Sequence, residues 1–197
     1  METSNEVKMR PQILNIAAQM FAERGYDGVS IREISAACGL SKAALYYHFE
    51  DKQALFMAIL QEHLEELSNL LDEAEALPGN ARRRLSALMR AILVRIPPDR
   101  RAIIRLATQD IAKVQPEVRR QFQQQYEARF IRRIESLIQS GIENSEFRNI
   151  PPALGTWAFL GIMYPFFTRP LAEQQNDAEH ILCLLESLFF EGLDRKP

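Results

Sequence analysis

Apolar residues recur every three or four positions along almost the whole chain, which is the spacing of one helical face. The longest series begins at Val118 and ends at Leu137, and it predicts a long helix. No segment has the strict alternation of apolar and polar residues that is typical of a half-buried strand. Pairs of helix breakers, among them Pro97-Pro98 and Pro151-Pro152, separate the series. The pattern therefore predicts an all-α protein of about nine helices.

Three of the predicted helices bear on how the chain is organised. One covers about 51–76, and two strongly apolar ones cover 151–168 and 177–193. Pro165 lacks a backbone N–H donor, so we expect it to kink or end its helix.

The segment 30–49, SIREISAACGLSKAALYYHF, predicts two short helices joined by a tight turn. The first begins at Ser30, Gly39 gives the turn its backbone freedom, and Ser41 caps the second. Such a pair forms a helix-turn-helix, whose second helix enters the DNA major groove. Short helices with glycine in the turn are also common in all-α proteins without DNA function. The spacing alone leaves both interpretations open.

The exposed side chains of this segment suit contact with DNA. Small residues at the start of the second helix let its backbone approach the bases, and alanine can touch a thymine methyl group. The residues concerned are Ser41, Lys42, Ala43 and Ala44. The side chains expected to hydrogen-bond phosphates are those of Tyr46, Tyr47 and His48. Lys52 begins the next helix, where its charge opposes the helix dipole unless a phosphate lies nearby.

Composition excludes several other classes of protein. Of the 197 residues, 47% are hydrophobic and 25% are charged, which excludes wholesale disorder. Two cysteines, Cys38 and Cys183, exclude a disulfide framework and a cysteine-based zinc site. The chain has three scattered histidines, no GxGxxG or GxxxxGK[ST] string, no paired carboxylates and no nucleophile–base set. We therefore expect no metal ion, no cofactor and no catalytic site.

The chain has no recognisable targeting or membrane signal. The N-terminus METSNEVKMRPQ contains no apolar stretch of the secretory type. No run of 18 apolar residues occurs, because Gly and Pro interrupt the nearest candidate, 153–168. We expect a cytoplasmic protein that does not engage a membrane.

The formal net charge of −2 hides an uneven distribution. Residues 56–80 carry −6, residues 81–148 carry +8, and residues 1–55, with the predicted helix-turn-helix, carry −1. Segment charge bears on partners and solubility, and not on the fold. We expect many arginines of 81–148 to lie on solvated faces and to pair with the acidic residues of 56–80, although arginine also favours phosphate through its planar fork. The net charge does not exclude DNA; it predicts weak non-specific binding to it.

Residues 13–60 closely resemble the N-terminal domain of TetR-type transcriptional repressors. The matching positions are Ala17, Phe21, Gly25, Ile34, Ala37, Gly39, Leu45, Tyr46, Phe49, Lys52 and Leu55. The rest of the chain matches the family only in length and helical content. The resemblance implies a homodimer with a helix-turn-helix domain at 1–52 and an effector-binding and dimerisation domain at 53–197, linked by the helix over about 51–76. It also implies a ligand-responsive repressor on a palindromic operator.

The resemblance assigns DNA contacts position by position. Arg32 occupies a place where the family can contact a base, and Ser30 stands at the start of the same helix. The remaining DNA-contact positions are Ser41, Lys42, Ala44, Tyr46, Tyr47, His48 and Lys52. Ala43 is small, as this position often is in the family.

The last two helices are expected to form the dimer interface as a four-helix bundle. The apolar residues expected there are Leu154, Trp157, Ile181, Leu184, Leu185, Leu188 and Phe189. These faces would equally close the core of a single subunit, and only the family resemblance favours the dimer.

An effector pocket is expected in the larger domain, with an apolar and aromatic lining. The candidates are Arg105, Gln109, Phe122, Tyr126, Arg129, Phe130, Trp157, Phe159, Met163 and Phe166, each of which also suits a plain core position. The stretch GTWAFLGIMYPFFTRP loosely resembles a helix of regulators that sense fatty acyl-CoA. We therefore expect a small hydrophobic or acyl-CoA-like effector, its anionic end held near Arg105 or Arg129. The alternative is an all-α small-molecule-binding or enzymatic protein without DNA function.

Overall fold

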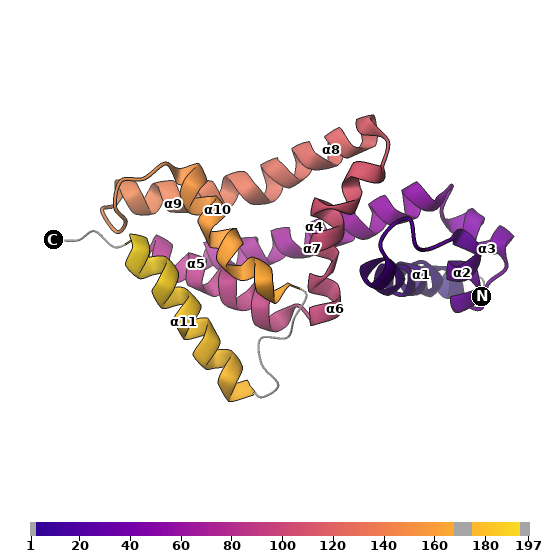
Figure 1. Ribbon diagram of the computed structural model, residues 1–197, viewed down its shortest axis with the longest axis horizontal. Helices are drawn as coiled ribbons and strands as arrows, with labels where there is room; N and C mark the ends of the chain where they lie inside the picture. The colour runs from indigo at the N-terminus through magenta and orange to yellow at the C-terminus, as the bar shows by residue number, and fades with distance from the viewer. Residues whose placement is uncertain (1–2, 168–174, 194–197) are drawn as a thin grey trace. The chain divides into compact units, whose positions relative to one another are not determined.

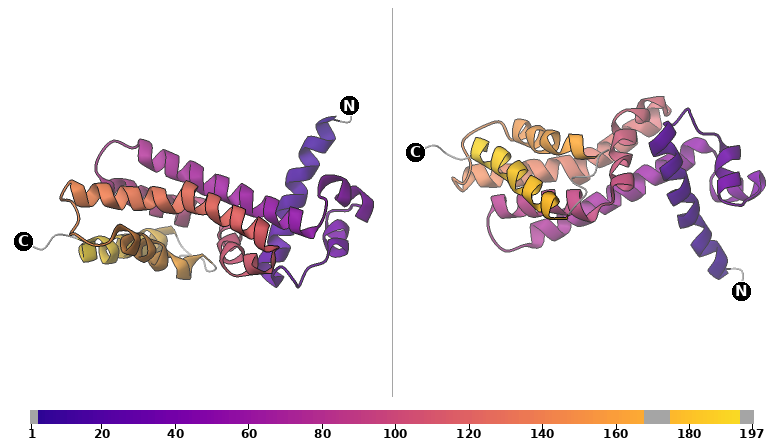
Figure 2. Two further views of the ribbon diagram at one scale, coloured as in Figure 1. Left: turned by 90° about the horizontal axis from the view of Figure 1, so that it is seen from above. Right: turned by 60° about the horizontal axis from the view of Figure 1, so that its bottom comes forward.

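The computed structural model describes residues 3–167 and 175–193, which form helices and no strands (Figures 1 and 2). The expected all-α class is therefore confirmed. The α-helices are α1 (Thr3–Arg24), α2 (Ile31–Ala37), α3 (Lys42–His48), α4 (Lys52–Ala76), α5 (Ala81–Arg90), α6 (Pro98–Arg101), α7 (Ile103–Thr108), α8 (Pro116–Tyr126), α9 (Arg132–Glu143), α10 (Pro152–Met163) and α11 (Gln175–Leu193).

Shorter turns extend or join these helices. Two are π-helical, η1 (Ala91–Arg95) after α5 and η3 (Glu127–Ile131) between α8 and α9. Because η3 leaves no gap, residues 116–143 form the long helix that the apolar series predicted. When each turn is counted with the helix that it extends or joins, and α6 is counted with α7, the described residues form nine helical stretches, as expected.

The helix predicted over 151–168 is shorter in the structure, where α10 ends at Met163. A 3-10 turn, η4 (Tyr164–Phe166), follows and contains Pro165. Proline cannot donate to the helical ladder and disfavours helical geometry in the residue before it. The expectation that Pro165 would end this helix is confirmed.

The chain divides into two compact units. The first comprises residues 1–63 and 102–122, and the second comprises 64–101 and 123–197. Helix α4 contributes its first turns to one unit and its remaining turns to the other. The boundary predicted after residue 52 separates a DNA-binding domain from an effector-binding domain, which is a division by function and not by compactness. It stays a prediction.

The first unit is built on aromatic packing beneath the two short helices. The rings of Phe21 and Phe56 meet edge to face at 5.4 Å, and the ring of Tyr26 lies 4.8 Å from that of Phe56. Ile34 and Leu45 are fully buried and anchor α2 and α3 to this core. Burying one such side chain contributes about 1.5–3 kcal/mol, so these anchors outweigh what helices of seven residues supply alone.

Polar contacts tie residues 102–122 to the rest of the first unit. The guanidinium of Arg105 donates to the carbonyl oxygen of Ala22 in the last turn of α1. The Lys113 ammonium lies 2.9 Å from an Asp27 carboxylate oxygen and 2.7 Å from one of Asp110. The turn between α1 and α2 is thus pinned to η2 (Asp110–Lys113) by one shared cation.

The second unit contains α5, α9, α10 and α11, which pack in succession on one another (Figure 2). Some of the arginines around this core pair with acids of α4, as the charge distribution predicted for many of them. The pairs are Arg129–Glu65, Arg100–Glu66, Arg95–Glu73, Arg133–Asp72 and Arg133–Glu75. The pairs of Arg129 and Arg95 are well exposed and the others are partly exposed, and exposed ion pairs contribute little to stability. They compensate most of the acidic residues of 56–80 and part of the positive charge of 81–148.

A capping box holds the start of α2. The backbone N–H of Glu33 donates to the Ser30 hydroxyl at 3.3 Å, and the backbone N–H of Ser30 donates to the Glu33 carboxylate at 2.8 Å. The Ser30 hydroxyl also donates to that carboxylate, at 2.7 Å, and the Arg24 guanidinium does so at 2.6 Å. The Ser30 hydroxyl, then Arg24, lower the pKa of Glu33 from 4.5 to about 2.

The Glu33 pKa predicts a specific pH dependence of stability. A carboxyl whose pKa falls on folding stabilises the fold fully above 4.5, and this contribution is lost as the pH falls toward 2. Glu33→Gln keeps an acceptor for the cap but removes the titration. We expect its free energy of unfolding, measured by urea denaturation from pH 5 to pH 2, to fall less steeply than that of the wild type. Equal slopes for both proteins would contradict this role.

Close packing at Gly141 predicts a large effect of a single methyl group. A Cβ at this position would overlap the Phe147 ring and lie 3.0 Å from the Cβ of Ala81. Phe147 is buried and stacks on Phe190 at 6.1 Å, so its ring has no room to move. We expect Gly141→Ala to lower the free energy of unfolding by about 1–3 kcal/mol in urea denaturation.

Gly192→Ala is the matched control, because no atom lies within 4 Å of its added Cβ. Alanine is the better helix former, so this variant should be unchanged or up to about 1 kcal/mol more stable. Equal effects of the two substitutions would show that the contact with Phe147 is not the cause.

Candidate nucleic-acid interface

Helices α2 and α3 are joined by a turn whose hydrogen bonds define its geometry. The N–H of Leu40 donates to the carbonyl of Ser35 at 2.8 Å, and the N–H of Gly39 donates to that of Ala36 at 3.1 Å. This pair of bonds is the Schellman motif, which requires a left-handed residue after the helix. Gly39 supplies it with φ of +67°. The turn therefore fixes how the second helix leaves the first (Figure 1).

Helix α3 has one buried anchor and an otherwise accessible surface. Its first turn is capped by Ser41, whose hydroxyl oxygen accepts from the N–H of Ala44 at 3.1 Å. Leu45 is the fully buried residue of α3, and Phe49, the residue that follows the helix, is buried as well. The Ser41 hydroxyl hydrogen is not used in the cap, so it can still be donated to a phosphate.

The structure brings the predicted contact residues together on α2, α3 and the start of α4. The exposed ones are Ser30, Arg32, Ser41, Lys42, Ala43, Tyr46 and Tyr47, and the half-buried ones are Ala44, His48 and Lys52. Tyr47 is the most open, with 75% of its surface exposed, which excludes a packing role for its ring within this subunit. Whether these residues contact DNA stays a prediction.

Aromatic rings position two of the polar groups. The Lys42 ammonium lies 5.5 Å from the centre of the Tyr46 ring, and the Tyr47 ring stands edge-on to the imidazole of His48 at 5.4 Å. Cation–π contacts at exposed sites are worth about 0.5–1 kcal/mol, enough to bias a side chain but not to hold it. Lys42 is therefore directed over α3 and remains able to reach a phosphate or base.

Lys52 has an internal partner that the sequence did not reveal. Its ammonium lies 4.2 Å from the centre of the Tyr26 ring, in the turn between α1 and α2. Burial lowers the pKa of Lys52, with a smaller contribution from the positive charge of Lys113, while Asp27 opposes the shift. A phosphate oxygen here would relieve the unfavourable placement of this cation at the start of α4.

The expected effector-pocket residues fall in different compact units. Arg105, Gln109 and Phe122 belong to the first unit, and the other candidates belong to the second. Gln109 and Trp157 are exposed, and Phe122, Phe130, Phe159 and Met163 are buried. The two expected anchors of an anion have partners already, since Arg105 donates to Ala22 and Arg129 pairs with Glu65. The pocket itself stays a prediction.

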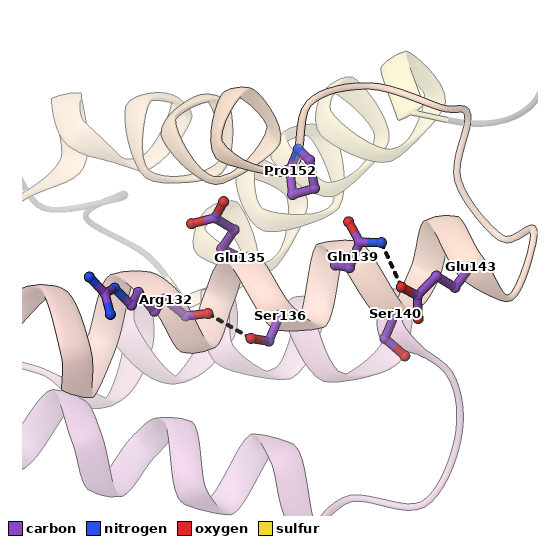
Figure 3. A pocket seen from close by; sticks show the side chains of 7 residues that line it. All are labelled: Arg132, Glu135, Ser136, Gln139, Ser140, Glu143 and Pro152. Carbon is purple, nitrogen blue, oxygen red and sulfur yellow. Dashed lines mark hydrogen bonds between the residues drawn. The ribbon is translucent and has the colours of Figure 1, made fainter.

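Figure 3 shows a hollow of another kind, on the surface of the second unit. Its lining is Arg132, Glu135, Ser136, Gln139, Ser140, Glu143 and Pro152, almost all from α9. The Ser136 hydroxyl donates to the Arg132 carbonyl at 2.9 Å, and the Gln139 amide donates to Glu143 at 2.6 Å. This open, polar lining does not suit an apolar effector, and it contains none of the expected pocket residues.

Helices α10 and α11 carry exposed apolar residues on one face. Leu154, Trp157, Leu184 and Leu188 are exposed, with Leu188 at 68%. Gly161 continues the series of α10, and nothing lies within 4 Å of a Cβ added to it. The other expected interface residues differ: Ile181 is half-buried, while Leu185 and Phe189 are buried inside the subunit. We call Leu154, Trp157, Gly161, Leu184 and Leu188 the α10–α11 face.

Arg101, which the sequence analysis did not single out, is the most unusual charged residue of the second unit. Only 2% of its surface is exposed, and its Nε and Nη1 atoms have no hydrogen-bond partner. The arginine runs of the sequence gave no means of telling a buried member from exposed ones. Only the doublet Arg100-Arg101, where α6 ends, could have directed attention to it.

The described chain offers neither a membrane-crossing helix nor a metal-binding cluster. Among its helices, none combines the length and apolar character that crossing a membrane requires. Within residues 3–167 and 175–193, no cluster of three or more His, Cys, Asp or Glu side chains is arranged to hold a metal ion.

Comparison with known proteins matches both parts of the chain. Residues 13–59 match the family model described as "Bacterial regulatory proteins, tetR family", and residues 78–165 match "Tetracyclin repressor-like, C-terminal domain". The "HTH-type transcriptional repressor Rv1474c" of Mycobacterium tuberculosis is 41% identical over 78 residues, covering 40% of this chain and 41% of the relative. The "HTH-type transcriptional activator FasR" of Mycolicibacterium smegmatis is 37% identical over 82 residues, covering 42% and 37%. The chain thus spans about two fifths of these curated relatives.

A solved structure extends the likeness to nearly the full length. The complex of AibR with isovaleryl coenzyme A and operator DNA superimposes with a TM-score of 0.78 at 25% identity, covering 92% of this chain and 98% of AibR. The two family models together span more than half of the chain, and the helix-turn-helix carries the motif residues. Regulators, and not enzymes, make up these matches, so the enzymatic alternative is wrong. The chain belongs to the TetR family of bacterial transcriptional regulators.

Proposed function

We propose that this protein is a homodimeric repressor that acts in the cytoplasm, binds a palindromic operator and releases it when a small hydrophobic or acyl-CoA-like effector binds. The observation that carries the proposal is the arrangement of α3. Its first turn is capped, a buried leucine anchors it, and Lys42, Tyr46 and Tyr47 are exposed on it. A helix held in this way can enter a major groove without losing its packing.

Few charges carry the DNA contact, because the first 55 residues are slightly acidic. Arg32, Lys42 and Lys52 are the cations of the predicted contact set, and a two-fold axis doubles them. Hydroxyl and N–H donors then fix the register on the phosphates. Two recognition helices of one dimer reach successive major grooves when they lie about 34–36 Å apart, so the operator is an imperfect palindrome.

The α10–α11 face supports the dimer. Large apolar side chains that stand together on adjacent helices are costly in water, and a second copy presenting the same face removes them from it. Gly161 lets two helices approach closely at this point, because no side chain stands between them. Buried Leu185 and Phe189 support this face from inside the subunit.

The effector class rests on the likeness to AibR, whose structure holds isovaleryl coenzyme A. An effector acts by differential affinity for the DNA-binding and released states, typically with about 1–3 kcal/mol of coupling. Helix α4 is shared by both compact units and is the natural link between effector and DNA. Repression is preferred because relatives such as Rv1474c are called repressors, although FasR is called an activator.

DNA binding is tested with Lys42→Ala and Tyr47→Ala on DNA selected from a random library by the wild-type protein. We expect the selected DNA to be palindromic and the gel shift to be weakened at least about tenfold by each change. The loss of a phosphate contact also lowers the slope of log affinity against log salt by about 1.

The control is Arg132→Ala, which removes an exposed arginine of α9 in the second unit and should shift DNA as the wild type does. Circular dichroism should show the same helicity for all variants. Failure of the wild type to select any DNA sequence would favour the alternative of a small-molecule-binding protein without DNA function.

Dimerisation is tested with Leu188→Glu, which places a charge at the most exposed leucine of the α10–α11 face. We expect the mass by light scattering to fall from that of two chains to that of one, and operator binding to fall with it. Val94→Glu is the matched control, because Val94 is also an exposed apolar residue, at 46%, but lies in η1 outside this face. A dimeric Leu188→Glu would contradict the proposed interface.

A further inference from the structure

Arg101 differs from the other arginines of its unit in that its charge is buried, and it has no acidic partner among the described side chains. It is the one arginine or lysine that is buried among the described side chains whose burial is given. Neighbouring Arg100 lies 3.4 Å from a Glu66 carboxylate oxygen. Among the described side chains no acid pairs with Arg101, and two of its three guanidinium nitrogens, Nε and Nη1, have no hydrogen-bond partner.

Such a placement is unfavourable for the protein alone. A guanidinium removed from water without an anion loses its hydration and gains no ion pair in return. Burial lowers the pKa of Arg101, and no acidic group offsets the shift. Arginine nevertheless stays protonated at neutral pH, so the side chain carries its positive charge inside the unit.

The helical stretch before Arg101 contains buried apolar residues and an irregular turn. Ile92, Leu93 and Ile96 precede it and are buried. The first two belong to the π-helical turn η1, and the same unit contains the second π-helical turn, η3. Single π-helical turns inside α-helices occur frequently at functional sites. An unpaired cation in such a region matches a ligand with an apolar body and one anionic group.

We propose that Arg101 binds the anionic group, a carboxylate or a phosphate, of an amphipathic effector within the second unit. Its planar guanidinium has two N–H donors without a partner, on Nε and Nη1, that can donate to the oxygens of an anion, and arginine favours carboxylate and phosphate oxygens as acceptors. The inference rests on the proposed function, because it identifies the residue that recognises the effector. Arg101 thus takes the place of Arg105 and Arg129 as the expected anchor of the anionic group, since both of those arginines already have partners.

The position of Arg101 also suits regulation. It is the last residue of its segment in the second unit, and the next residues, 102–122, belong to the compact unit of the helix-turn-helix. Arg105, four residues on, is bound to the last turn of α1. An anion that orders Arg101 therefore acts on the chain immediately before a segment fixed to the DNA-binding helices.

The test compares the full-length wild type with Arg101→Met, which keeps the length of the side chain and removes the charge. Arg95→Met is the matched control, because Arg95 is an exposed arginine paired with Glu73. The probes are sodium octanoate for a carboxylate, isovaleryl coenzyme A for a phosphate-bearing ligand, and octanol as the neutral counterpart of octanoate. Binding is measured by calorimetry, and thermal unfolding is followed at matched ionic strength.

We expect octanoate or isovaleryl coenzyme A to bind the wild type and Arg95→Met alike, and Arg101→Met roughly ten- to a hundredfold more weakly. Whichever of the two anions binds identifies the source of the anionic group. Octanol should not distinguish the three proteins. Without a probe, Arg101→Met should unfold at the same temperature as the wild type or higher, because it lacks an unpaired buried charge.

The proposal is overturned if neither anion binds the wild type, if Arg101→Met binds the anions as the wild type does, or if it unfolds at a clearly lower temperature. If Arg101→Met does not fold, Arg101→Lys takes its place; it keeps the charge but loses the fork, and anion binding equal to the wild type overturns the proposal. Gel shifts separate this inference from the proposed function. Arg101→Met should still bind operator DNA, but the anion should no longer release the DNA from it. A wild type that binds no DNA overturns the proposed function, and calorimetry then decides on the anion site by itself.

Discussion

The DNA-binding part of this protein depends on stabilising two helices of seven residues each, which are too short to persist in water by themselves. Hydrogen bonds at their ends satisfy backbone groups that such short helices cannot satisfy internally: the capping box at Ser30 and Glu33, the Schellman turn at Gly39, and the cap at Ser41. Ile34 and Leu45 then add the buried surface. Because all of this support comes from the inner side and the ends, the outer side of α3 is left to polar and small residues.

Charge is organised by pairing in the larger unit. The acidic turns of α4 pair with Arg100 of α6, Arg95 of η1, Arg129 of η3 and Arg133 of α9, which compensates part of the net charge of +8 on residues 81–148. Against this background an arginine without an acid is informative. Arg101 stands out because its neighbours are paired and because it is buried.

The order of helices followed from the sequence to a large extent. The apolar series from Val118 to Leu137, the end of α10 before Pro165, and the pairing of acidic with basic segments were all predicted correctly. The predicted DNA contacts were brought to one region, because they lie within about twenty residues of one another in a motif closed by local hydrogen bonds. The partner of Lys52 was missed, since Tyr26 lies far from it in the chain.

What the sequence determined by itself is the local part of the structure: the helical class, the turn at Gly39, the caps and the family. These features depend on residues three or four positions apart, and such spacings can be recognised directly in the amino-acid sequence. The tertiary structure alone decided which of several similar residues is buried, exposed or paired. Leu184 and Leu188 are exposed while Leu185 and Phe189 are buried. Arg129 pairs with Glu65 across 64 positions, while Arg101 pairs with none of the acids that the structure describes. Burial and ion pairing are determined by packing between segments that are distant in the chain, and these contacts cannot be inferred from helical periodicity.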